Sequence, residues 1–171
     1  MSDNHPITIS HFLAFPIVMR NPPLCRRFLE QVLDIKIREI EFVEKELDLT
    51  DSFIYHGLQL DVYVEDSENS VYNVEMQNSV ETMRRVRYYQ SGIDRRLLEK
   101  GAHYSQLKTS FVIMICNYDP THVPRSRKDA ASEEVPGLAY PMYKRESVIA
   151  CPVGSFTYDD GSHAIFLNEV R

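Results

Sequence analysis

Apolar and polar side chains alternate along residues 58–77, in two runs that a short polar segment separates. Alternation with a period of two predicts two strands of a sheet, and the polar segment DSENS predicts the turn of a hairpin. If Glu65 lies opposite Val71, then Asp61 falls directly opposite Glu75. Two like charges in that position destabilise a sheet, so this pair of acids needs a physical explanation.

The two faces of the predicted hairpin differ in polarity. One face carries Leu58, Leu60, Val62, Val64, Tyr72, Val74 and Met76, and the other carries Gln59, Asp61, Tyr63, Asn73, Glu75 and Gln77. The apolar face must pack on the core, under a helix. The polar face is either exposed to water, as one side of an antiparallel sheet commonly is, or it binds a ligand. A different turn length would shift the register and remove the opposition of the two acids.

A metal site is the ligand-binding interpretation of the polar face. Directly opposed residues have Cβ atoms about 5 Å apart, so Asp61 and Glu75 can share a hard divalent cation. Mg²⁺ takes oxygen ligands and keeps several waters, and its charge would offset the repulsion between the acids. Gln77 projects onto the same face, where its amide can position a water or a phosphate oxygen.

Two segments have the apolar spacing of amphipathic helices. Asn21 followed by Pro22 and Pro23 predicts the start of the first helix, and Asn78 with Glu81 resembles a capping box that opens the second. The apolar positions are Leu24, Cys25, Phe28, Leu29, Val32 and Leu33 in the first helix, and Val86, Tyr89, Ile93 and Leu97 in the second.

Further strands are predicted at residues 35–46, 109–118, 146–153 and 163–170. The run at 109–118 is continuously apolar with β-branched residues, which favours a strand buried on both faces. We expect a turn-rich connector at 48–57 and a polar loop at 119–136.

Length and composition favour one globular domain over residues 1–171. No apolar run is long enough to cross a bilayer, and no signal-peptide pattern is present, so we expect a cytoplasmic protein without a membrane partner. The three cysteines do not form a recognisable disulfide framework, which favours buried, reduced thiols. Histidines and cysteines lack the spacing of a zinc site.

The formal net charge of −6 argues against a protein that coats nucleic acid through bulk charge. Local basic segments remain available for a DNA contact. They are MRRVR at 83–87, DRRLLEK at 94–100 and VPRSRK at 123–128.

Asp61 followed by Glu75-Met76-Gln77 resembles the D…(D/E)xK signature of the PD-(D/E)xK nucleases, with glutamine in the lysine position. Five ordered stretches extend the similarity: LDVYVED with VYNVEMQ, RRVRYYQSGID, LLEKGAHYSQLK, FVIMICNYDP and IFLN. Together they resemble the bacterial PD-(D/E)xK nuclease family transposases, also called recombination-promoting nucleases, over roughly Arg20 to Asn168. The resemblance implies an α/β, restriction-endonuclease-like fold, in which helices flank a mixed β-sheet core.

The resemblance also implies a site that cleaves DNA with Mg²⁺, or with Mn²⁺ as the alternative cofactor. Asp61 and Glu75 match the metal-binding acids, and Gln77 matches the third motif residue. Gln90 lies in the matching YYQ segment, and Arg87 one turn before it is a candidate phosphate contact. Arg84 and Arg85 are candidate general DNA contacts, although such arginines are also typical of a solvated helix face. Tyr88 and Tyr89 have a second interpretation as core aromatics.

The chain departs from the family pattern near its start. Relatives carry an acidic residue and then a Phe-Lys pair, whereas HFLAFPIVMRNP places Phe12 or a neighbour at the acid and Pro16 at the lysine. Glu30 can replace the missing acid as a metal ligand if the first helix covers the polar face, and otherwise is a surface residue. We also expect that the chain lacks a helical C-terminal extension found in relatives.

Two functions therefore compete at the level of sequence. The first is a metal-dependent DNA endonuclease linked to transposition or recombination, with DNA as partner and a homodimer as one option. The second is a catalytically inactive relative that binds DNA or protein, which the glutamine in the lysine position favours.

Overall fold

The computed structural model describes residues 14–48, 59–77, 82–118, 120 and 141–168. Their main feature is a mixed six-stranded sheet with the order β1-β2-β3-β4-β8-β5. Its strands are β1 (Ile40–Asp48), β2 (Gln59–Asp66), β3 (Val71–Gln77), β4 (Ser110–Cys116), β8 (Ser162–Asn168) and β5 (Met142–Lys144). The β1, β2 and β3 strands are antiparallel, β3, β4 and β8 are parallel, and β5 is antiparallel to β8.

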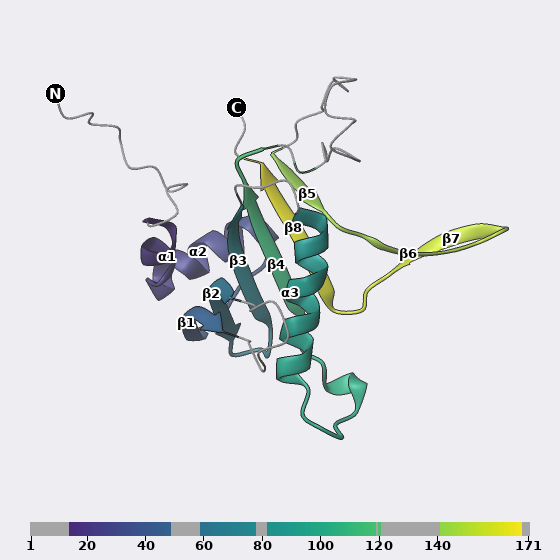
Figure 1. The fold of residues 1–171 in the computed structure, drawn as a ribbon, viewed down its shortest axis with the longest axis horizontal. Coiled ribbons are helices and arrows are strands. Elements are labelled where there is room, and N and C mark those ends of the chain that lie inside the picture. Colours follow the sequence, from purple (N-terminus) through teal and green to yellow (C-terminus); the bar gives the residue numbers. More distant parts are fainter. Residues whose placement is uncertain (1–13, 49–58, 78–81, 119, 121–140, 169–171) are drawn as a thin grey trace.

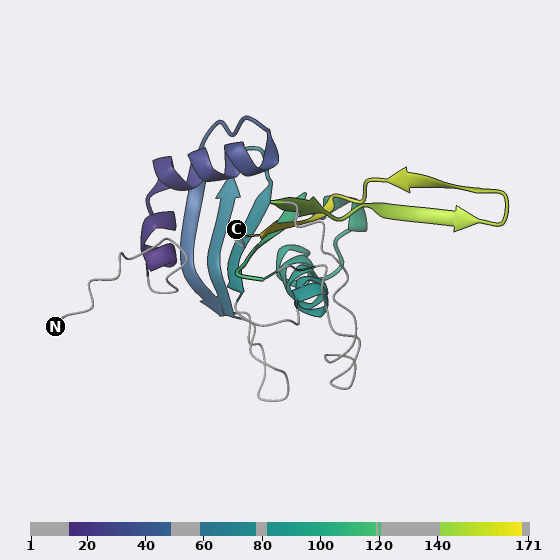
Figure 2. The ribbon, with the colours of Figure 1, turned by 90° about the horizontal axis from the view of Figure 1, so that it is seen from above.

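Helices cover both faces of this sheet (Figures 1 and 2). The helices α1 (Ala14–Met19) and α2 (Pro22–Leu33) pack on one face, and α3 (Thr82–Leu97) packs on the other. A short 3₁₀ helix, η1 (Tyr104–Gln106), follows α3. This arrangement confirms the predicted α/β, restriction-endonuclease-like fold class. None of the helices in the described residues is long and apolar enough to span a membrane.

The start of α2 follows its sequence signals. The Asn21 side chain caps the helix by accepting a hydrogen bond from the Leu24 N–H, and two prolines occupy the first turn. The buried stripe is Cys25, Leu29 and Leu33, whereas Leu24 is exposed although it was predicted on the apolar face. Cys25 is buried, as predicted, and burial raises the pKa of its thiol to about 12, which disfavours the reactive thiolate.

The hairpin of β2 and β3 has the predicted register, with Glu65 opposite Val71. Its turn is organised by Asp66, which is buried. One carboxylate oxygen accepts hydrogen bonds from the N–H groups of Glu68 and Ser70, both at 2.9 Å, and the other accepts from the Tyr72 hydroxyl at 2.6 Å. These bonds fix the turn length on which the register depends.

The remaining strands were predicted in part. The run at 109–118 forms the central strand β4, and 163–170 contains β8. The strand expected from residue 35 begins only at Ile40, because residues 35–39 pair with no strand. The sequence analysis missed β5, which is only three residues long, and β7 (Gly154–Tyr158), which begins at a glycine.

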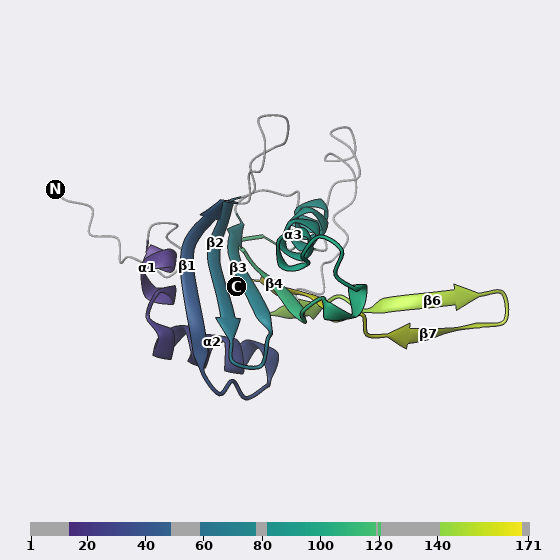
Figure 3. The same ribbon diagram turned by 90° about the horizontal axis from the view of Figure 1, so that it is seen from below.

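The predicted strand at 146–153 is β6 (Ser147–Cys151), but it does not join the sheet. It pairs antiparallel with β7 as a separate hairpin. Figure 3 shows this hairpin extending away from the rest of the molecule. The capping box at 78–81, the connector at 49–57 and the polar loop, except for Pro120, lie outside the described residues, as does Phe12.

Asp66→Ala should lower the free energy of unfolding by about 2–4 kcal/mol, because two backbone donors and a buried tyrosine hydroxyl lose their acceptor. Urea denaturation measures this change. Glu68→Ala in the same turn is the matched control and should change stability by less than about 0.5 kcal/mol, since the Glu68 side chain is exposed. Equal effects of the two substitutions would contradict the role given to Asp66.

Candidate functional site

The candidate site lies where β2 and β3 stop pairing with each other. Their backbone pairing runs from Glu65 and Val71 to Val62 and Val74. Beyond that point β2 continues to pair with β1, and β3 continues to pair with β4 as far as Gln77. The two strands therefore lose their mutual ladder at one end, while each keeps its outer neighbour.

The predicted pair of acids occupies this end of the hairpin. Glu75 Oε1 accepts a hydrogen bond from the backbone N–H of Asp61 at 3.0 Å, and Asp61 Oδ2 accepts one from the N–H of Met76, also at 3.0 Å. Each carboxylate thus takes a backbone donor of the opposite strand, in place of a ladder bond. The side chains are held between the strands and close to each other, as the sequence predicted.

The face that carries the acids is covered by α3, so the interpretation of a water-exposed polar face is wrong. Glu75 is only 2% exposed, whereas Asp61 is partly exposed. Burial, and then the charge of Asp61, raise the pKa of Glu75 to about 8; the Asp61 N–H, Asn73 and Tyr89 act in the opposite direction. Burial thus favours the protonated form of Glu75 in the absence of metal, while part of the Asp61 surface remains exposed.

A second set of contacts links Gln77 to α3. Gln77 is buried, and its Oε1 accepts a hydrogen bond from the Arg85 guanidinium at 2.9 Å. The same guanidinium donates to the Tyr89 hydroxyl at 2.6 Å and lies over the Tyr89 ring. Burial and the charge of Glu75 raise the pKa of that hydroxyl. Arg85 and Tyr89 are four residues apart, so they lie on the same side of the helix.

The structure thus assigns the arginines differently from the sequence analysis. Arg85, expected to be a general DNA contact, is the arginine that reaches the motif residue Gln77. Arg84, Arg85 and Arg87 are all exposed on α3, but among the contacts that the structure gives only the Arg85 side chain reaches Gln77 and Tyr89, and Arg87 has no contact with the acid pair. Tyr89 is both a core aromatic and a member of the site. The signal that could have found Arg85 is its four-residue spacing from Tyr89.

Gln90 and Glu30 lie away from the acid pair. Gln90 is buried and donates to the Ser110 hydroxyl at the first residue of β4. Glu30 lies on α2, which covers the opposite face of the sheet, and its carboxylate accepts a hydrogen bond from the Ile37 N–H at 3.0 Å. The condition for Glu30 as a third metal ligand, that the first helix covers the polar face, is therefore not met.

The acid pair suits a hard cation in its chemistry. Two carboxylates meet there, and their mutual repulsion contributes to the raised pKa of Glu75. Asn73 on the same face is fully buried, and its side chain acts to lower the pKa of Glu75. Within the described residues no three His, Cys, Asp or Glu side chains form a metal-binding group. A cation would thus need further oxygens from the backbone, from water or from a substrate, as Mg²⁺ commonly takes.

Without metal, Glu75 should make the protein less stable as pH rises. The pKa of Glu75 is about 8 in the folded state against an ordinary value of 4.5, so between these values only the folded state keeps the proton. As pH rises from about 5 to 8, the stability of Glu75→Gln relative to the unsubstituted chain should increase by about 2–4 kcal/mol. Urea denaturation in the presence of a chelator measures this.

Glu65→Gln is the matched control, since Glu65 lies on the same face of β2 as Asp61. Burial acts to raise the pKa of Glu65, but hydrogen bonds from Tyr63 and Lys108 and the charge of Lys108 lower it overall. Glu65 therefore stabilises the fold above its ordinary pKa, and its substitution should have the opposite sign. A pH dependence unchanged by Glu75→Gln would contradict the buried, protonated state of Glu75.

Comparison with known proteins identifies the family. The family model described as PD-(D/E)XK nuclease family transposase matches residues 19–132, which include α2, the strands β1 to β4 and α3. The searches of curated proteins and of solved structures found no match. The matched segment is two thirds of the chain and contains both acids, Gln77 and Arg85. The chain therefore belongs to the PD-(D/E)XK nuclease family transposases.

Proposed function

We propose that the chain is a divalent-metal-dependent DNA endonuclease linked to transposition or recombination. The observation that carries this proposal is the pair of carboxylates, Asp61 and Glu75, held together where two strands part. A purely structural role explains this pair poorly, because it places a like charge beside a buried acid. Because the chain belongs to a nuclease family, a catalytic role in metal binding is the better explanation for the pair.

Asp61 and Glu75 would hold the metal in this proposal. A bound Mg²⁺ or Mn²⁺ would supply Lewis-acid activation of water and neutralise charge at the scissile phosphate. Glu75 must lose its proton to act as a ligand, so metal affinity should increase with pH up to about 8. Asp61, the more exposed of the two acids, would face the incoming phosphodiester.

Arg85 would supply the positive charge that the motif lysine provides in relatives. Gln77 cannot carry charge, but its Oε1 holds one arm of the Arg85 guanidinium, and Tyr89 holds another. Tyr89 also interacts with Glu75, and this chain of contacts supports a role for Arg85 as the cation that acts near the acid pair. A guanidinium in such a position can bind a phosphate oxygen through its remaining donors.

The rest of the DNA contact would come from α3. Arg84 and Arg87 are exposed on this helix, near its end at the site. A local basic face of this kind can bind phosphates although the net charge of the chain is −6. Gln90 is buried, so we assign it a role in packing α3 on β4 rather than a direct contact with DNA.

A catalytically inactive DNA-binding protein is the second candidate function. Two observations favour it: the lysine of the motif is replaced by Gln77, and no third acid joins the pair within the described residues. Nicking of supercoiled plasmid with Mg²⁺ and with Mn²⁺ separates the two candidates. Salt-sensitive DNA binding without cleavage in either metal would support the second candidate.

Asp61→Asn should reduce plasmid nicking at least about a hundredfold, because the metal loses a charged ligand. Glu75→Gln should have the same effect although it stabilises the fold. Glu65→Gln removes a carboxylate from the same face of β2, four residues from Asp61, and should leave nicking within about threefold. Full nicking by Asp61→Asn would refute the proposed site.

Arg85→Ala should lower the nicking rate about tenfold to a hundredfold, since a fixed charge near the phosphate is lost. Arg85→Lys keeps the charge without the planar fork and should recover part of the rate. Arg84→Ala is the matched control on the adjacent exposed position and should change mainly DNA affinity and its salt dependence. If Arg84→Ala lowered the rate as much as Arg85→Ala, the specific role of Arg85 would be wrong.

A further inference from the structure

The hairpin of β6 and β7 has an unusual composition for an exposed element. Residues 147–158 contain no Asp, Glu, Lys, Arg or His. Within the described chain its two strands pair only with each other, and they extend from the molecule (Figures 1 and 3). An isolated two-stranded hairpin is marginally stable in water, so this element lacks an obvious source of stability in the monomer.

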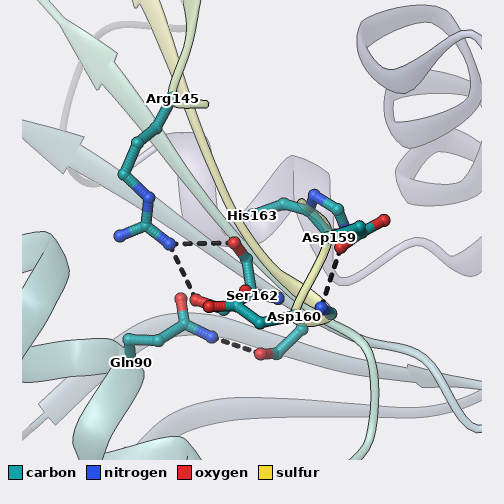
Figure 4. A network of polar contacts seen from close by, with 8 residues as sticks. Gln90, Arg145, Asp159, Asp160, Ser162 and His163 are labelled. Carbon is teal, nitrogen blue, oxygen red and sulfur yellow. Dashed lines mark hydrogen bonds and ion pairs between the residues drawn. The ribbon is translucent and has the colours of Figure 1, made fainter. Parts of the chain in front are cut away.

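The root of the hairpin, which comprises Arg145 before β6 and residues 159–162 after β7, is nevertheless fixed by several polar contacts. The Arg145 guanidinium, just before β6, donates to the backbone oxygen and the hydroxyl of Ser162 at 2.8 and 2.7 Å, and its backbone N–H donates to Ala164. Asp160 accepts from the Ser162 N–H, and His163 pairs with Asp159 (Figure 4). The two legs of the hairpin are thus tied to the start of β8, and the arm projects in a defined direction.

The two faces of the hairpin differ in the size of their side chains. Paired residues share a face, so the register puts Ile149 and Phe156 side by side, with Tyr158 and Cys151 on the same face. The other face carries Val148, Ala150, Ser155 and Thr157. All of these side chains are exposed; Phe156 is 60% exposed and the tip residue Val153 is 96% exposed. We call the face with Ile149 and Phe156 the large-residue face.

The chemistry of the large-residue face narrows the choice of partner. A DNA-binding arm would carry Lys or Arg for the phosphates, and this hairpin has none. An acidic or basic protein partner would also find no opposite charge. In a two-fold contact each surface meets a copy of itself, and an uncharged surface meets its copy without repulsion.

We propose that the large-residue face of the β6–β7 hairpin binds the same face of a second copy of this chain. The two hairpins pack face to face around a two-fold axis with their strands running in opposite directions. In that arrangement Ile149 lies over Ile149 and Phe156 over Phe156 of the partner subunit. The two globular bodies then lie at opposite ends of the paired hairpins.

The sizes of the remaining side chains fit this antiparallel arrangement. Tyr158, the largest residue of the face, lies over the partner's Gly154, which has no side chain. A Cβ added at Gly154 would meet no atom within 4 Å in the monomer, so the space above it is open. Cys151 lies over the partner's Ser147, and both are small. Large residues therefore face small ones, and the two central residues face their own copies.

The hairpin tip also approaches the partner in this arrangement. The same register carries Val153 to the root of the partner's hairpin, near the equivalents of Arg145 and Asp159. A cavity of about 430 Å³ lies at that root; its lining is mainly charged or polar, with Arg145, Glu146, Asp159, Asp160 and His163 beside Ser147 and Tyr158, so it is not an apolar pocket for Val153. The exposed tip and the cavity are one hairpin length apart, as the reciprocal contact requires.

The available surface is sufficient for a reversible dimer. At the observed exposures the side chains of Ile149, Phe156, Tyr158, Cys151 and Val153 contribute on the order of 500 Å² per copy. Two copies would bury about 1,000 Å², which lies at the low end of specific interfaces. We therefore expect association in the micromolar range and not an obligate dimer.

The test is the oligomeric state of the full 171-residue chain, measured by sedimentation velocity under reducing conditions. The unsubstituted chain should form dimers as its concentration rises, and Ile149→Asp should weaken dimerisation at least about tenfold. Val148→Asp is the matched control: Val148 is 53% exposed and Ile149 is 48% exposed, but they point to opposite faces. Val148→Asp should leave the dimerisation constant within about threefold.

Cys151 provides an independent measurement on the same samples. It is exposed, whereas Cys25 and Cys116 are buried, so a thiol reagent reports on Cys151 alone in the folded protein. Its reaction should slow several-fold at concentrations that favour the dimer, and Ile149→Asp should abolish that protection. A chain that stays monomeric at all concentrations, or equal weakening by Ile149→Asp and Val148→Asp, would overturn the proposal. Neither result depends on nuclease activity.

Discussion

The site depends on the parting of β2 and β3 at the end where their two acids meet. With a complete ladder, Asp61 and Glu75 would repel each other on the sheet surface while the backbone groups bonded across the gap. Instead each carboxylate accepts a backbone N–H of the opposite strand, so the strands stay connected through the groups that carry the chemistry. Burial and the neighbouring charge of Asp61 disfavour the ionised form of Glu75 and raise its pKa to about 8. The opposite end of the hairpin, tied by Asp66, and the outer strands β1 and β4 maintain the register that this arrangement needs.

The helix α3 covers the face of the sheet that carries Glu75 and leaves Asp61 partly exposed. It packs on the face that carries Glu75 through Val86, Tyr89 and Ile93, which belong to the hydrophobic core. The Tyr89 ring is therefore fixed by packing, while its hydroxyl interacts with Arg85 and Glu75. A charged residue near the start of the helix is thus positioned by the same contact that buries the acid. This coupling brings Arg85 into contact with Gln77 and with Tyr89, which itself interacts with Glu75.

The sequence predicted local features well and the relative placement of helices poorly. The alternation of apolar and polar residues and the five-residue DSENS turn were sufficient to predict the register of the hairpin. Both signals place the same residues opposite each other. Whether the polar face is exposed to solvent depends on where α3 packs on the sheet. That position is set by contacts between distant segments of the chain, which local sequence patterns do not reveal. That Arg85 and not Arg87 contacts Gln77 has the same origin, since the rotation of α3 about its axis is set by Val86, Tyr89 and Ile93 in the core. Glu30 lies away from the acid pair because α2 covers the other face of the sheet. The position of β8 in the sheet was likewise beyond local signals.

The acid pair and the β6–β7 hairpin lie toward opposite ends of the sheet. This separation decides whether dimer contact through the hairpin would cover the acids. The acids lie toward the C-terminal end of β3, level with Met114 and beyond on β4. The root of the β6–β7 hairpin lies at the other end of the sheet, where Ser110 pairs with Ser162. Four residues of a strand separate these levels by more than about 10 Å. A second copy bound through the hairpin would therefore leave the acid pair and the exposed arginines of α3 accessible. In each subunit the gap between the two acids would remain independent of the contact that joins the two copies.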